Sequence, residues 1–210
     1  MPRAMSDPGV RADLAARVRD PHVAPFADLV DELRAQHPGR TVPHVAPTSL
    51  GVEARLLVVH RSPAPAPAPA GPAGTTDGEP LLSVEGDDGG SERLHGLLTA
   101  AGIDPALVLP WNAVPWAVDP EQPLSAADAK AGRLVLARVV DLLPRLRVVV
   151  LHGREVEPVW DALAAAGTAL PPGIRVEGTF STEDAALAQH RASRLRRMAA
   201  VYASAADALR

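Results

Sequence analysis

Three short apolar runs, separated by helical stretches, constrain this chain more than any other feature. The runs are ARLLVVH (54–60), ALVLPWN (106–112) and RVVVLH (147–152). Uninterrupted apolar segments of this length are typical of strands buried on both faces. Strands that alternate with helices predict a parallel sheet covered by helices. We therefore expect an α/β fold, a three-layer α/β/α sandwich around a central, mostly parallel four-stranded sheet.

The other elements are predicted from apolar periodicity and from capping residues. Helical patterns over 10–36 are broken by Pro21 and Pro25, and the second of them, FADLVDELRAQH, carries an apolar stripe. Ser91 is a candidate N-cap, and Ser125 with Asp128 resembles a capping box. We expect further helices at 92–101, 125–143, 154–166 and 183–209. A short fourth strand is expected at 174–176.

The length of 210 residues is enough for one domain with a core of its own. We expect a single domain over 1–210, with an N-terminal helical segment over 1–50. Residues 61–80 are rich in Pro and Ala, which favour polyproline II and cannot form a strand ladder. This segment is expected to be a stiff surface loop; the alternative is a ligand for a proline-binding module.

Charge and residue usage narrow the classes of partner and cofactor. Net charge is −4, whereas proteins that hold long duplex DNA are usually basic, so DNA contact is expected only from a local patch. Cys is absent, which excludes disulfides, Cys-ligated zinc and thiol nucleophiles. The seven His show no i, i+4 pair, so we expect no metal site and no cofactor.

The hydropathy of the chain indicates no membrane association. There is no apolar run of 18 residues, and the first residues, MPRAMSDPGV, lack the apolar stretch of a signal peptide. We therefore expect a cytoplasmic protein, and we expect it to be a monomer.

Polar residues end each of the three predicted strands. They are His60-Arg61, Trp111-Asn112 and His152-Gly153-Arg154. Open parallel α/β sheets bind ligands at the carboxyl ends of their strands. The coincidence of three such ends predicts one pocket at this edge of the sheet.

Several segments, in order along the chain, carry a family resemblance. WNAVPW (111–116) matches a WN-x-VPW motif fully, and the segments at 20–47 and 142–155 are similar to those that flank it. Together they resemble a divergent bacterial, actinobacterial-type branch of the uracil-DNA glycosylase superfamily. The resemblance implies a parallel sheet between helices. It also implies hydrolysis of the N-glycosidic bond of a deaminated base that has left the DNA stack.

The resemblance assigns base-binding roles at three positions. Asn112 stands where the family reads the base, since an amide offers both a donor and an acceptor to an imide edge. The alternative is that Asn112 only caps the turn before Val114. Leu82 stands where relatives carry a Phe beside the base, and lacks its aromatic face. Ser83 is retained.

At other positions the family's pattern is lost. Arg61 replaces the acid that handles water, and an arginine cannot be a general base at neutral pH. Thr179 replaces the His that stabilises the departing base, which removes charge assistance. Ser181 is retained in this last motif, where it would contact DNA.

Two histidines are candidates to replace the lost groups. His60 and His152 end neighbouring predicted strands and could converge with Arg61 into a catalytic set that favours an anionic or phosphate-bearing ligand. The alternative is that each His satisfies a strand-end backbone group. Arg191 and Arg194, on the predicted C-terminal helix, are candidates for contacts with DNA phosphates; the alternative there is a solvated helix face.

Three functions are compatible with these residues. The first is a divergent glycosylase that excises or binds a damaged base in DNA. The second is a catalytically degenerate protein that binds nucleic acid or a nucleotide. The third is a protein-interaction module that keeps only the fold. An open, positively charged groove would favour the first two, and a filled pocket the third.

Overall fold

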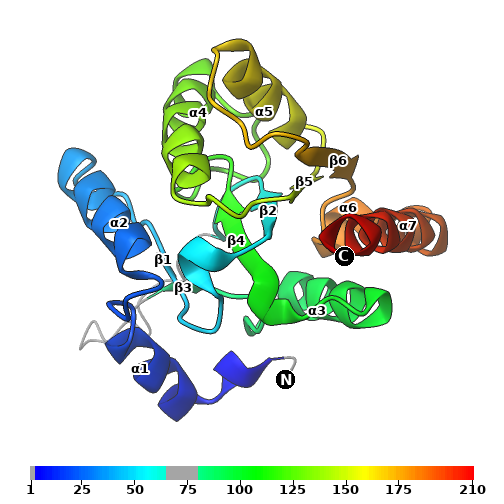
Figure 1. Ribbon diagram of the computed structural model, residues 1–210, viewed down its shortest axis with the longest axis horizontal. Helices are drawn as coiled ribbons and strands as arrows, with labels where there is room; N and C mark the ends of the chain where they lie inside the picture. The colour runs from blue at the N-terminus through cyan, green and yellow to red at the C-terminus, as the bar shows by residue number, and fades with distance from the viewer. Residues whose placement is uncertain (1–2, 65–79) are drawn as a thin grey trace.

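The computed structural model describes residues 3–64 and 80–210, and a four-stranded parallel sheet lies at its centre (Figure 1). The strand order is β4-β2-β5-β6, and every neighbouring pair is parallel. The expected α/β class is therefore confirmed. The four strands are β2 (Leu56–His60), β4 (Val108–Asn112), β5 (Val148–His152) and β6 (Arg175–Thr179).

Helices cover both faces of the sheet and make the outer layers of the sandwich (Figure 1). Alternate strand residues point to opposite faces, so Leu57 and Val59 join one hydrophobic cluster while Leu56 and Val58 join the other. The first cluster packs under α2 (Ala24–Gln36), α4 (Ala126–Asp141) and α5 (Val156–Ala165). The second packs under α3 (Gly89–Ala101) and α7 (Arg191–Leu209).

Side-chain caps set where the helices begin. The Ser125 hydroxyl accepts a hydrogen bond from the Asp128 backbone N–H at 3.0 Å, which confirms Ser125 as the N-cap of α4; the Asp128 carboxylate accepts from the Ser125 hydroxyl at 2.6 Å. For α3 the predicted N-cap Ser91 is wrong. Asp88 takes that role and accepts from the Ser91 backbone N–H at 2.8 Å, so the helix begins three residues before Glu92.

Other elements differ from the prediction. A two-residue parallel pair, β1 (His44–Val45) with β3 (Leu81–Leu82), was not expected. β6 runs through Thr179, beyond the predicted 174–176. The predicted helix over 183–209 is interrupted, because His190 has a left-handed φ of 57° and separates α6 (Asp184–Leu187) from α7.

Short elements complete the N-terminal part and the connections. They are η1 (Ala4–Ser6), α1 (Pro8–Ala16), η2 (Gly51–Glu53) and η3 (Pro105–Leu107). Most of the Pro/Ala-rich segment predicted as a loop, residues 65–79, lies outside the described residues. No helix within 3–64 and 80–210 has the length and apolar character that crossing a bilayer requires.

Candidate functional site

The last residue of each strand of the central sheet is polar, and together these residues form one row across the sheet. His60 is in register with Asn112 of β4, and His152 is in register with Thr179 of β6. The rings of His60 and His152 join the two halves of the row. Because residues alternate along a strand, the row faces the side covered by α3 and α7. We call these four residues the polar row.

His60 and His152 converge at the centre of the polar row. Their rings stack with centroids 4.8 Å apart. Burial lowers the pKa of His60 to about 4, against a smaller opposing effect of the Asp88 charge. Burial and the neighbouring His60 also lower the pKa of His152 well below its usual range. Both imidazoles are therefore neutral at pH 7.

Both ring nitrogens of His152 are engaged. Nδ1 lies 2.9 Å from the carbonyl oxygen of Phe180, and Nε2 lies 2.7 Å from the hydroxyl of Tyr202. A carbonyl only accepts, so Nδ1 carries the proton and Nε2 accepts from the Tyr202 hydroxyl. Burial raises the pKa of Tyr202, which keeps this donor protonated. His152 therefore holds the strand end in place, in agreement with the alternative that it satisfies a backbone group.

The two ends of the polar row carry buried polar atoms without partners. Among the described residues, neither Asn112 Nδ2 nor Thr179 Oγ1 has a hydrogen bond. Trp111 Nε1 shares this property but belongs to the other face, where its ring lies 6.4 Å from that of Phe26. A buried donor without a partner costs about 1–3 kcal/mol. Asn112 and Thr179 therefore retain unused hydrogen-bonding capacity, and neither lines the cavities at the amino end of the sheet or between α2 and α4.

Replacing Thr179 with valine is expected to stabilise the protein by about 1 kcal/mol, because it removes a buried unpaired hydroxyl at nearly constant volume. Chemical denaturation measures the free energy of unfolding. The control is Thr41→Val at an exposed position, expected to lie within about 0.5 kcal/mol of the parent. A destabilised Thr179→Val variant would show that the hydroxyl has a structural role.

Arg61 is directed away from the polar row. Its Nε donates to Glu155 at 2.6 Å, and its terminal nitrogen donates to the carbonyls of Asp119 and Gln122 at 3.3 and 2.5 Å. Glu155 also accepts from the Leu124 backbone N–H at 2.9 Å. Arg61 thus fastens the loop after β4. His60 and His152 converge as expected, but both are neutral and Arg61 does not join them, so that part of the expected catalytic set is wrong.

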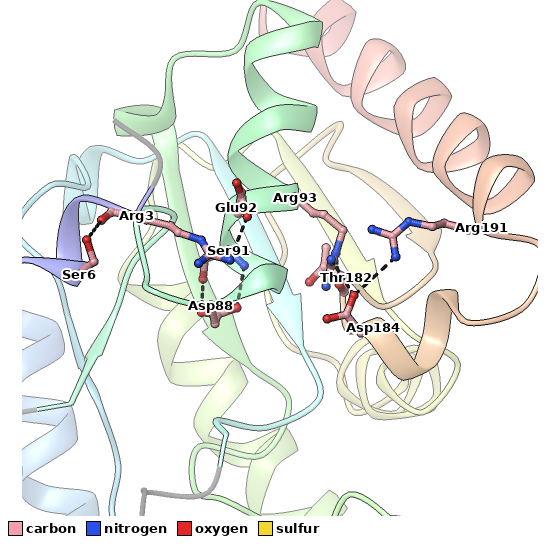
Figure 2. Close-up of polar contacts among 9 residues, drawn as sticks. All are labelled: Arg3, Ser6, Asp88, Ser91, Glu92, Arg93, Thr182, Asp184 and Arg191. Carbon is pink, nitrogen blue, oxygen red and sulfur yellow. Dashed lines mark hydrogen bonds and ion pairs between the residues drawn. The ribbon is translucent and has the colours of Figure 1, made fainter.

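Two acidic side chains act near the polar row: Asp88, the N-cap of α3 drawn in Figure 2, and Glu183, the N-cap of α6. Asp88 accepts from the Ser91 backbone N–H and hydroxyl at 2.8 and 2.6 Å, and its charge acts on His60. Burial, followed by the charge of Asp88, raises the pKa of Glu183. Gly90 packs between them: a Cβ there would lie 3.0 Å from Asp88 Oδ1 and 3.3 Å from Glu183 Oε1.

Arg93 connects this acidic region to the segment after β6. Its Nε donates to the carbonyl of Thr182 at 2.5 Å, and its NH1 pairs with Asp184 at 2.9 Å. Arg191, at the start of α7, pairs with the same carboxylate at 3.6 Å. Figure 2 draws this contact beside that of Arg93. These contacts hold the start of α3 against the start of α7, close to the ends of the strands.

Of the predicted base-binding residues, Leu82 ends β3 and Ser83 follows it, so both lie outside the four strands of the central sheet. Leu82 is half-buried and packs against the cluster under α2, α4 and α5. The Ser83 hydroxyl accepts from the Glu85 backbone N–H at 3.0 Å and lies 3.4 Å from that of Thr48. Both residues thus have contacts within the protein, and their role in base binding stays a prediction.

The predicted DNA-contacting residues surround the end of β6. The Ser181 hydroxyl accepts from the Glu183 backbone N–H at 3.2 Å. Arg194 donates to the carbonyl of Ala186, and its guanidinium lies 5.2 Å from the centre of the Phe180 ring. Arg191 is exposed. Of the predicted pair, Arg191 is therefore the better placed to reach a phosphate.

Tyr202 and Glu183 are parts of the site that were missed from the sequence. Tyr202 is the only tyrosine and falls on the buried stripe of α7, with Met198, Ala205 and Leu209. A lone hydroxyl on an otherwise apolar stripe was the available signal. The sequence carried no signal for Glu183, because its environment depends on Asp88, which is distant in sequence. No three His, Asp or Glu of the described residues are arranged to hold a metal ion.

The fold and the polar row together define an α/β/α protein with a polar site at the carboxyl end of its sheet. No protein-family model matches the chain, and no curated protein matches it in sequence. Among solved structures, it is similar to wild-type SMUG2 of Pedobacter heparinus, with 13% identity and a TM-score of 0.49. That match covers 88% of this chain and 97% of SMUG2.

Proposed function

We propose that this chain is a divergent uracil-DNA glycosylase-like protein that takes a damaged base of DNA into the polar row and hydrolyses its N-glycosidic bond slowly. One observation carries the proposal. Asn112 lies within WNAVPW at the end of β4, is 3% exposed, and has a buried amide nitrogen without a partner. WNAVPW is also the motif by which the sequence resembles that superfamily.

An unpaired amide at this depth favours recognition of a base over a role in packing. The amide can donate from nitrogen and accept at oxygen, which complements an imide edge such as that of uracil. Such a ligand would supply the hydrogen-bond partner that the Asn112 amide nitrogen lacks within the protein. An amide that only capped a turn would have a backbone partner within the protein.

The neighbouring groups are suited to water activation. In the proposed step, a water oxygen attacks C1′ of the nucleotide and the N-glycosidic bond breaks. The base leaves with the bonding electrons, and the proton of the water passes to Asp88. Two hydrogen bonds from Ser91 orient that carboxylate. The Thr179 hydroxyl would donate to the departing base without a charge, so the rate would be lower by a factor of about 100 or more than with a cation.

A second candidate is a protein that binds the base without cleaving it. It is favoured by the engagement of Arg61 with Glu155 and of His152 with Tyr202, which leaves only neutral donors near the base. Recognition by Asn112 is common to both candidates, and only the chemical step separates them.

We expect slow excision that depends on Asn112 and Asp88. Single-turnover assays would use labelled single- and double-stranded oligonucleotides that contain uracil, hypoxanthine or xanthine. Asn112→Ala and Asp88→Asn are each expected to lower the rate about 100-fold. Asp87→Asn is the matched control, because it makes the same charge change at a neighbour that lacks the contacts of Asp88 with Ser91, and it should keep the parent rate.

Binding to the same oligonucleotides separates the remaining outcomes. Binding that is lost in Asn112→Ala, without any cleavage, would support the second candidate and overturn the first. The absence of both cleavage and Asn112-dependent binding would contradict both, and would favour the interaction module that keeps only the fold.

A further inference from the structure

We propose that the chain has a second ligand site, for a compact phosphate-bearing anion, at the amino end of the central sheet. This is the end opposite the polar row, and the inference is independent of the proposed function. A cavity of about 400 Å³ lies there, where β2 and β5 begin. It is lined by Arg55, Arg145 and Arg147, together with Pro144, Leu146, Pro171 and Pro172.

The strand ladder holds two of these arginines side by side. Arg55 precedes β2 and Arg147 precedes β5, and the Arg147 backbone N–H donates to the Arg55 carbonyl at 2.9 Å. Neighbouring strands lie about 4.8 Å apart, so the two side chains start from adjacent rigid positions. The protein thus places two permanent positive charges together by its backbone.

Neither of these two guanidinium groups is neutralised within the protein. Across residues 3–64 and 80–210, the side chains of Arg55 and Arg147 make no ion pair and no hydrogen bond. The third arginine, Arg145, pairs with Glu53 at 2.7 Å. Three arginines therefore line the cavity, and only Arg145 is paired with a carboxylate. The positive charges of the other two arginines are uncompensated.

The chemistry of this lining selects the ligand class. Like charges on adjacent strands repel, and a bound anion would remove that cost. Guanidinium groups offer planar, paired N–H donors that match phosphate oxygens. The proline side chains make the walls stiff and add no competing charge. The volume lies near the lower end of the range for small-molecule sites, which favours a compact phosphate or diphosphate group.

The test is a calorimetric titration of the full chain with inorganic pyrophosphate at low salt, with sodium chloride of equal ionic strength as the reference. Saturable binding is expected for the parent. Arg55→Gln and Arg147→Gln should each raise the dissociation constant at least about tenfold. Arg196→Gln is the matched control: this arginine is exposed on α7 and does not line the cavity, and its change should leave the dissociation constant within about twofold.

Three results would overturn the proposal: no saturable binding by the parent, unchanged binding by the Arg55→Gln/Arg147→Gln double variant, or an equal loss in Arg196→Gln. Unfolding midpoints of all variants would identify a loss caused by misfolding. Competition by a short unmodified oligonucleotide would show that DNA phosphates can supply the ligand. If the oligonucleotide does not compete with pyrophosphate, the ligand of the site is a free small molecule.

Discussion

Alanine in place of Gly132 is expected to destabilise the protein by about 3 kcal/mol. Gly132 lies in α4 where this helix crosses the chain just after β4. A Cβ there would lie 1.9 Å from the Ala113 carbonyl oxygen and 2.9 Å from its carbon. Alanine normally favours a helix by about 1 kcal/mol over glycine. The clash is with backbone, so it outweighs that gain.

The same substitution at Gly96 gives a control with the opposite sign. Gly96 is exposed in the middle of α3, and a Cβ there would meet nothing within 4 Å. Gly96→Ala is expected to stabilise the protein by about 1 kcal/mol. Urea unfolding of both variants measures the difference. Equal stability of the two variants would show that α4 can move away from Ala113, against the close packing described above.

Acidification is expected to remove about 3 kcal/mol of stability through His60. Burial lowers the pKa of His60 from 6.5 to about 4, and each unit is worth about 1.4 kcal/mol. A group whose pKa is lowered by folding stabilises the protein fully above its unfolded pKa. That contribution is lost as the pH falls from 6.5 towards 4. The lowered pKa of His152 acts in the same direction.

The free energy of unfolding as a function of pH, measured for the parent and for His60→Gln, isolates this effect. The parent should lose more stability than the variant between pH 7 and pH 4. Glu183, whose pKa is raised, acts in the opposite direction but is common to both proteins. His95→Gln on α3 serves as the control and should follow the parent. Parallel curves for the parent and His60→Gln would contradict the burial of a neutral imidazole.

Three strands of the sheet, β2, β4 and β5, were predictable because they are buried on both faces, which leaves uninterrupted apolar runs such as that before His60. The pair β1 and β3 was not, because two residues carry no periodicity. The interruption at His190 was also hidden, since the Ala-rich pattern continues through it and only its left-handed φ ends the helix. Local pattern thus predicts long, buried elements and misses those that depend on distant contacts.

The polar row was accessible to sequence reasoning, because parallel strands end at one edge and their last residues must meet there. The role of each residue in the row could not be predicted from the sequence. The charge of Arg61 is neutralised by Glu155, which lies 94 residues away. The proton of His152 is placed by Phe180, just after β6, and by Tyr202 of α7. Residue identity therefore located the site, and only the tertiary contacts determined its charge.

The position of β6 at the edge of the sheet affects how molecules of this protein associate in solution. It is an edge strand of five residues, with Val176 38% exposed, so its outer backbone groups could template a strand from another molecule. Arg175 and Glu177 carry charges there, and Ser204 of α7 hydrogen-bonds to both side chains. An added strand would have to desolvate these charges. The edge thus resists growth of the sheet from one molecule into the next.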